Sequence, residues 1–163
     1  MINISEADVS ETKEIKQLLN YVWSTAHGSI FSKETIKYIT EKGQTYENLK
    51  KEIEDTNILF IVAKNDLKKI IGLATVKNKD KDKDVFIQRL YIHPSYQSQG
   101  IGKNILINIV NRFKNMKSIH LEVEENNDKA LKFYKKCGFN IVKRNEYELK
   151  GDEFKTFLME KLF

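Results

Sequence analysis

The sequence of 163 residues contains one cysteine, Cys137, one proline, Pro94, and three histidines. A single cysteine excludes an intramolecular disulfide, and no two histidines stand at metal-ligand spacing. The longest apolar run, residues 58–63, is far shorter than the roughly 20 residues of a membrane helix. The first residues lack the basic-then-apolar pattern of a signal peptide. These absences predict a cytoplasmic protein with no disulfide, no metal and no membrane-spanning segment.

The charge balance is mildly basic, with 28 Lys and Arg against 23 Asp and Glu and a formal net charge of +5. Such an excess fits ordinary solubility, attraction of a phosphorylated small ligand, or nucleic-acid binding. No predicted helix carries a basic stripe interleaved with aromatic residues, so nucleic acid is ranked last and not expected as a partner. No repeat, linker or change of composition divides the chain, and residues 1–163 are therefore expected to form a single domain.

Hydrophobic periodicity predicts about seven strands and four to five helices. The predicted strands cover 2–5, 58–64, 70–77, 85–92, 119–123, 139–149 and 154–162. The predicted helices cover 8–23, 32–39, 45–54, 100–115 and 128–137. We expect Ser10 and Ser32 as N-caps and Gly138 as the residue that ends the last helix. The order is neither a regular alternation nor all-β, so it predicts an α/β (α+β) fold with helices packed on a mixed sheet.

The strongest functional signal lies between Gln88 and Lys103. Here a strand ends at Pro94, a polar turn follows, and Gly100 and Gly102 open a helix. Such a turn directs backbone N–H groups outward at a helix N-terminus, which makes an anion site, and glycine lets a phosphate approach the main chain. A Walker loop is excluded because residue 104 is neither Ser nor Thr, and a Rossmann fingerprint because residue 105 is not glycine.

The string Gln97–Gly102 resembles the acetyl-CoA-binding motif Q/R-x-x-G-x-G/A of the GNAT superfamily of N-acetyltransferases, and residues 90–94 resemble its L-Y-V-x-P lead-in. The resemblance implies the GNAT fold, with a mostly antiparallel sheet, and acetyl-CoA as cofactor. It also implies that backbone amides of the loop hold the pyrophosphate, while the preceding strand pairs with the pantetheine arm. The implied cofactor contacts are Leu90, Tyr91, Ile92, Gln97, Ser98, Gln99, Gly100, Ile101, Gly102 and Lys103. The family usually has Arg-Gly at positions 98 and 99, a modest loss because the loop binds mainly through its main chain.

A second block, residues 127–139, resembles the family pattern N-x-x-A-x-x-F-Y-x-x-x-G-F. From the residues alone, Ala130, Phe133 and Tyr134 lie near one face of a helix, and simple packing on the sheet explains such a stripe. A buried tyrosine hydroxyl, however, needs a partner. The resemblance implies that Tyr134 is the catalytic general acid that protonates the departing thiolate, and that Phe133 and Asn127 contact the cofactor. Asn127 could instead act only as a helix cap.

The implied reaction is direct attack of a neutral amine on the thioester, with the oxyanion held by a backbone N–H near Ile92 and no metal or covalent intermediate. The amine must first lose a proton. Many members place a glutamate on the fourth strand for this purpose, but Gln88 stands there and cannot accept one. Glu122, Glu124, His27 and a water chain are left open as the base, and each side chain also fits an ordinary surface role.

We expect the acceptor between the first two helices and the cofactor, with Trp23, His27, Glu122 and Glu124 as the candidate acceptor-binding residues. Residues 23–31 are similar to the PaiA-like polyamine acetyltransferase branch, which points to a small molecule such as the polyamine spermidine. A protein N-terminal or lysine acetyltransferase and a non-catalytic acyl-CoA-binding module are the alternatives. The sequence leaves a homodimer open.

Overall fold

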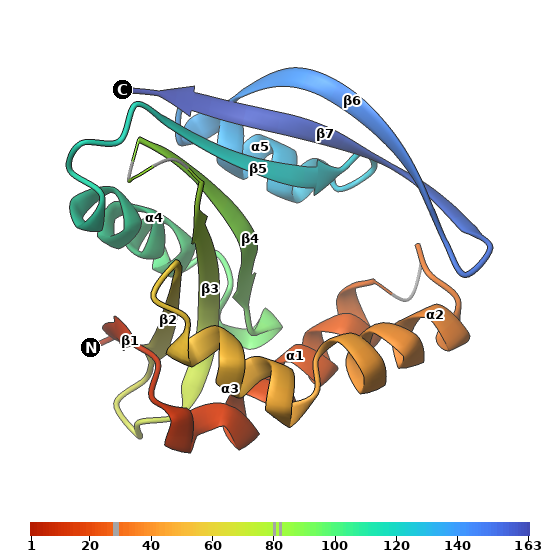
Figure 1. Ribbon diagram of the computed structural model, residues 1–163, viewed down its shortest axis with the longest axis horizontal. Coiled ribbons are helices and arrows are strands. Elements are labelled where there is room, and N and C mark those ends of the chain that lie inside the picture. Colours follow the sequence, from red (N-terminus) through yellow and green to blue (C-terminus); the bar gives the residue numbers. More distant parts are fainter. Residues whose placement is uncertain (28–29, 80, 82) are drawn as a thin grey trace.

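The computed structural model describes residues 1–27, 30–79, 81 and 83–163. At its centre lies a seven-stranded sheet in the order β1-β2-β3-β4-β5-β7-β6 (Figure 1). Neighbouring strands are antiparallel except β4 and β5, which are parallel, so the predicted mixed and mostly antiparallel sheet is confirmed. The strands are β1 (Asn3–Glu6), β2 (Ile58–Lys64), β3 (Ile70–Asn78), β4 (Asp84–Ile92), β5 (Ser118–Glu124), β6 (Asn140–Leu149) and β7 (Asp152–Leu162).

Five α-helices accompany the sheet in the described part of the chain: α1 (Thr12–Ala26), α2 (Lys33–Tyr38), α3 (Tyr46–Glu54), α4 (Ile101–Arg112) and α5 (Asp128–Lys136). A short 3-10 segment, η1 (Val9–Glu11), precedes α1, and another, η3 (Pro94–Tyr96), follows β4. Helix α2 continues into a π-helical turn, η2 (Ile39–Gly43). None of the helices among the described residues is long and apolar enough to cross a membrane. The predicted α/β (α+β) class is therefore confirmed.

The helix ends test the predicted caps. Ser10 is not an N-cap, because the carboxylate of Asp8 accepts from the Ser10 N–H at 2.9 Å and Glu11 accepts from the Asp8 N–H at 2.9 Å. This reciprocal pair begins a 3-10 turn two residues before the predicted cap. Ser32 is confirmed, since its Oγ accepts from the Thr35 N–H at 3.2 Å. Gly138 also ends α5 as predicted, with a positive φ of 93°.

The sheet is covered on both faces, and β2 shows how its sequence does this. Alternate side chains of a strand point to opposite faces. Phe60 and Val62 pack with α1 and α3, whereas Ile61 and Ala63 pack with α4 and α5. All four are nearly inaccessible to solvent, so the strand reads as one continuous apolar run.

The sheet parts between β4 and β5, and this break positions the site. The two strands pair only over Asp84–Ile87 and Ser118–Leu121. Opposite β3, Ile87 pairs with Val76 and Arg89 with Thr75, which leaves Gln88 as an extra, bulged residue. Beyond it β4 and β5 diverge (Figure 1), so the remainder of β4 has one open edge.

Candidate active site

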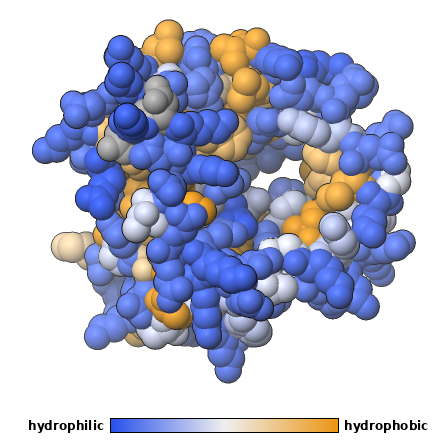
Figure 2. Space-filling model, viewed as in Figure 1, coloured by the Kyte–Doolittle hydropathy of each residue, from blue (hydrophilic) through white to orange (hydrophobic). Residues whose placement is uncertain are grey.

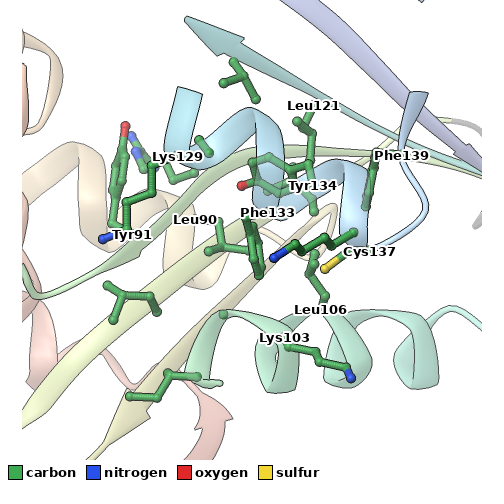
Figure 3. Close-up of a pocket in the computed structure, with 18 of the residues that line it drawn as sticks. Leu90, Tyr91, Lys103, Leu106, Leu121, Lys129, Phe133, Tyr134, Cys137 and Phe139 are labelled. Carbon is green, nitrogen blue, oxygen red and sulfur yellow. The ribbon is translucent and has the colours of Figure 1, made fainter. Parts of the chain in front are cut away.

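A cavity of about 1070 Å³ occupies the region where β4 and β5 part. It is walled by these two strands, by α4 and α5, and by the C-terminal end of α1 (Figure 3). A volume of this order suits a large cofactor together with part of a second substrate. Most of the residues predicted to contact a cofactor line it: Leu90, Tyr91, Ile92, Gln97, Ser98, Gly100, Ile101, Gly102, Lys103, Asn127, Phe133 and Tyr134.

The open edge of β4 offers backbone hydrogen-bonding groups to this cavity. The His93 N–H donates to the Ile71 carbonyl of β3 at 2.7 Å. Because successive residues of a strand present their backbone groups to opposite edges, the N–H and C=O groups of Ile92 and Leu90 point away from β3. The Ile92 carbonyl already accepts from the Gln97 side-chain amide at 3.1 Å. The other backbone groups on this edge face the gap between the strands.

The structure gives a reason for each glycine in the turn before α4, in addition to the predicted close approach of a phosphate. Gly100 is the N-cap of α4 and has a φ of +81°, a conformation that favours glycine. A Cβ at Gly102 would lie 3.1 Å from the Phe133 ring, so this glycine lets α4 and α5 approach each other. Gln99 departs from the prediction. It does not line the cavity, and its side chain donates to the Ser95 carbonyl at 3.3 Å.

Positive charge gathers on the side of the cavity formed by α4, α5 and the turn before α4. The Lys129 ammonium donates to Gln97 Oε1 at 2.6 Å, which ties α5 to the turn before α4. The sequence analysis missed this contribution of α5, although its spacing of three and four residues gave the signal. The lining lysines are Lys103, Lys129, Lys132, Lys136 and Lys161. Together with the outward amides of the turn, they can hold a polyanion such as a linked set of phosphates.

Tyr134 projects from α5 into the cavity, with its hydroxyl directed away from Phe139 and towards the side of Leu90 and Tyr91 (Figure 3). The ring is 8% exposed and packs edge-on against Phe133 and Phe139, at centroid distances of 5.0 and 5.5 Å. No described residue hydrogen-bonds to its hydroxyl. Burial raises the pKa of Tyr134, which therefore stays protonated at neutral pH.

The candidate acceptor residues fall into two groups. His27, Glu122 and Glu124 line the cavity together with Gln88, whereas Trp23 does not and instead stacks on the His27 ring at 4.2 Å. The indole nitrogen of Trp23 is buried without a partner among the described residues. Of the four candidate acceptor-binding residues, Trp23 alone is thus separated from the cavity lining, and it contacts His27 instead. Residues 28 and 29 of the predicted acceptor segment lie outside the described residues.

The three candidate bases differ in their surroundings. Burial lowers the pKa of His27, and its Nδ1 has no hydrogen-bond partner in the described chain. Both oxygens of Glu122 are engaged, one by the Tyr147 hydroxyl at 2.9 Å and one by Thr156 Oγ1 at 2.5 Å. Burial raises the pKa of Glu124. A neutral imidazole is a group suited to accept a proton.

Comparison with known proteins identifies the family. Residues 19–139 match the family model for the acetyltransferase (GNAT) family. The chain belongs to the GNAT family of acetyltransferases. It is thus an acyltransferase, and acetyl-CoA, the donor that the family uses, is its cofactor as predicted. Family membership favours the enzyme over the non-catalytic acyl-CoA-binding module.

Three proteins similar to this GNAT chain have named acceptors or a solved structure. Spermidine N(1)-acetyltransferase of Thermoplasma acidophilum is 25% identical over 170 aligned positions, covering 99% of this chain and 98% of the relative. The PaiA N-acetyltransferase of Thermoplasma acidophilum, solved in complex with coenzyme A, superposes with a TM-score of 0.85 at 25% identity, covering 100% of this chain and 99% of that one. The ribosomal protein bS18-alanine N-acetyltransferase of Haemophilus ducreyi is 29% identical over 150 positions, covering 90% of this chain and 87% of the relative. The family is thus established, while the relatives act on acceptors of different kinds.

This GNAT protein has a second cavity of about 660 Å³, and its lining is acidic. It lies between the end of β5, the β6–β7 hairpin and Ile30, and shares Glu124 with the first cavity. Arg144 pairs with two of its carboxylates, Glu125 at 2.5 Å and Glu146 at 3.1 Å. The lining residues are Ile30, Glu124, Glu125, Asn126, Glu146, Tyr147, Glu148, Glu153, Phe154 and Lys155. The main cavity is therefore basic towards α4 and α5 and adjoins an acidic cavity on its other side.

Proposed function

We propose that this acetyltransferase transfers the acetyl group of acetyl-CoA to a primary amine of a small polyamine such as spermidine. The observation that carries the proposal is the acidic cavity, which shares the lining residue Glu124 with the main cavity. A polyamine is a slender polycation, and the three lining glutamates that Arg144 does not pair favour its entry. The similarity along almost the whole chain to a spermidine N(1)-acetyltransferase supports the same acceptor.

The described residues fit coenzyme A. The open edge of β4 at Leu90 and Ile92 is suited to pair with the amide-containing arm, as an added strand would. The Gln97 N–H, which was predicted to hold phosphate, donates instead to the Pro94 carbonyl at 3.3 Å. The amides of residues 98–102 and the lysines of α4 and α5 are suited to the phosphates. The side-chain nitrogen of Asn127 is available to the arm, because only its Oδ1 is used to cap α5, accepting from Ala130 N–H at 3.1 Å. When bound, acetyl-CoA supplies an acetyl group activated as a thioester.

Tyr134 is proposed to supply the proton that the departing sulfur needs. Its raised pKa keeps the hydroxyl protonated at neutral pH, and the hydroxyl faces the cavity without a competing partner among the described residues. The backbone N–H of Ile92 faces the same opening, where it can stabilise negative charge that develops on the acetyl oxygen. The two groups therefore assist the two sites at which negative charge appears.

His27 is proposed as the group that deprotonates the acceptor amine. Gln88 cannot accept a proton. Both carboxylate oxygens of Glu122 already accept hydrogen bonds from the hydroxyls of Tyr147 and Thr156, so Glu122 is less suited to the role. His27 lines the cavity and is neutral at pH 7 because burial lowers its pKa. A general base is most efficient when its pKa lies near the working pH.

A panel of amines tests the acceptor. We expect spermidine and spermine to give the highest kcat/KM, measured by thiol release. Their values should exceed those of a monoamine with no second charged group and of a peptide with an N-terminal alanine. Glu148→Gln with Glu153→Gln should raise the KM for spermidine about tenfold, with little effect on the monoamine. Glu54→Gln, an exposed carboxylate on α3 away from both cavities, is the control. A higher kcat/KM for the peptide than for every polyamine would refute the proposal.

That peptide outcome would support the second candidate, a protein N-terminal acetyltransferase. Its specific support is the 29% identity to the bS18-alanine N-acetyltransferase of Haemophilus ducreyi over 90% of this chain. An acidic cavity also attracts a basic peptide, so charge alone does not separate the two acceptors. The double glutamine variant separates them, because a peptide held through its backbone loses less affinity than a polyamine held by charge.

A further inference from the structure

The tip of the β6–β7 hairpin is fastened to the start of α2, 120 residues earlier in the chain. Asp152 Oδ2 accepts from the Ser32 N–H at 2.9 Å and from Ser32 Oγ at 2.9 Å. These two bonds, together with the Phe31–Phe154 contact described next, are called the clasp. Ser32 is also the N-cap of α2, so the clasp attaches the hairpin tip directly to the N-terminal end of this helix.

Aromatic rings continue the clasp inward. Phe31 is 8% exposed and meets Phe154 edge-on at a centroid distance of 5.0 Å. Phe154 in turn stacks on Tyr147 at 5.4 Å, and the Tyr147 hydroxyl donates to Glu122. A chain of contacts thus runs from α2 across the hairpin to β5, the strand that walls both cavities.

The clasp closes a ring around the acceptor side of the molecule. Figure 2 shows an opening that passes through the molecule, and Figure 1 shows β4, β5, the β6–β7 hairpin and the α1–α2 region around it. The acidic cavity is lined from both sides of the clasp, by Ile30 before α2 and by Phe154 of the hairpin. Without the clasp the hairpin would end free, and the same cavity would be a groove open on one side.

We propose that the clasp between Asp152 and Ser32 is a specificity determinant, which encloses the acceptor passage so that only slender amines reach the thioester. This inference rests on the proposed function and adds to it the reason for selecting a free polyamine over an amine on a folded protein. A lysine or N-terminus on a folded protein brings bulk that a closed ring excludes, whereas an unbranched chain of methylenes and nitrogens enters end-on. Steric exclusion of the wrong acceptor is a recognised route to such discrimination.

The test compares one slender and one bulky acceptor. The probes are spermidine and the surface lysines of folded ubiquitin, each assayed by thiol release with Asp152→Ala, Asp152→Asn and the wild-type protein. Asp152→Ala should lower the spermidine-to-ubiquitin ratio of kcat/KM about tenfold by raising turnover of ubiquitin. Asp152→Asn keeps an oxygen that accepts from Ser32 and should keep the wild-type ratio. Glu34→Ala removes an exposed carboxylate of α2 that takes no part in the clasp and is the control.

Hydrogen exchange of the Ser32 amide reports independently whether the clasp has opened. Faster exchange in Asp152→Ala with an unchanged ratio would overturn the proposal, as would an equal fall for both acceptors. If Asp152→Ala does not fold, Phe31→Leu weakens the clasp from the other side and should shift the ratio in the same direction. If the wild-type protein acetylates no polyamine, the proposed function fails. The clasp is then judged with butylamine as the slender acceptor, and an unaltered butylamine-to-ubiquitin ratio overturns it.

Discussion

Replacement of Tyr134 by phenylalanine separates the chemistry of the site from its packing. The substitution removes one hydroxyl and keeps the ring between Phe133 and Phe139. That hydroxyl has no hydrogen-bond partner among the described residues, so its loss leaves no buried donor or acceptor unsatisfied. We therefore expect the free energy of unfolding to change by less than about 1 kcal/mol.

The effect on turnover should be far larger. A positioned general acid contributes a factor of about 10² to 10⁴ to the rate. This corresponds to about 3 to 5 kcal/mol of transition-state stabilisation. Tyr134→Phe should accordingly lower kcat by that factor at saturating amine and acetyl-CoA. The Kd for coenzyme A should stay within about twofold of the wild-type value, because the phosphate and β4 contacts are untouched.

Thiol release under saturating conditions gives kcat, calorimetry gives the Kd, and urea unfolding gives the stability. Tyr46→Phe, a half-exposed tyrosine on α3 that lines neither cavity, is the matched control and should behave as wild type. Unchanged kcat in Tyr134→Phe would refute the general-acid role. A fall in kcat matched by an equal loss of stability would show that the hydroxyl serves the fold instead.

Two further predictions concern pH. The kcat/KM of the wild-type protein should rise with pH through a pKa below the ordinary histidine value of 6.5, since only the neutral imidazole of His27 accepts a proton. His27→Gln should remove this acidic limb and lower the plateau, and survival of the limb would assign the base elsewhere. Hydrogen bonds from Thr35 and Ser32 lower the pKa of Asp152 from its ordinary 3.8. Its stabilising contribution is thus complete above about pH 3.8 and is lost as the pH falls through the lower folded-state pKa, so Asp152→Asn should flatten the acid limb of the stability curve measured by urea unfolding.

Local pattern was sufficient to predict the elements of the fold but not their arrangement. The run 58–64 has the length and composition of a buried strand, and it is β2. The sheet order β5-β7-β6 depends on long-range pairing, which no local pattern reveals. The N-cap error has a similar cause. Asp8 and Ser10 both have capping side chains, and the choice depends on Glu11 reaching back to the Asp8 N–H.

The candidate site divides in the same way. The turn at 97–102 and Tyr134 were predictable, because each lies in a short contiguous motif. The lysines of α5 showed helical spacing, but a solvated helix face has the same spacing, so only the fold shows that they line a cavity. The acidic cavity was not predictable, because its glutamates come from β5 and from both arms of the hairpin. Only the pairing of β5 with β7 brings Glu124 beside Thr156, the neighbour of Lys155. Glu146 of β6 lies on the other side of β7, opposite Lys155.

The two cavities differ in the charge of their lining residues. Lysines of α4, α5 and β7 line the main cavity, whereas glutamates of β5, β6 and β7 line the acidic one. The cavities meet at Glu124, on the strand that diverges from β4 after the bulge at Gln88. An anionic donor and a cationic acceptor would therefore be drawn from opposite sides towards the same gap, into which Tyr134 projects. The bulge at Gln88 follows directly on the last β4–β5 pair, where the open edge that suits the donor begins. Because the two attractions are Coulombic, raising the salt concentration should increase both KM values while leaving kcat nearly unchanged.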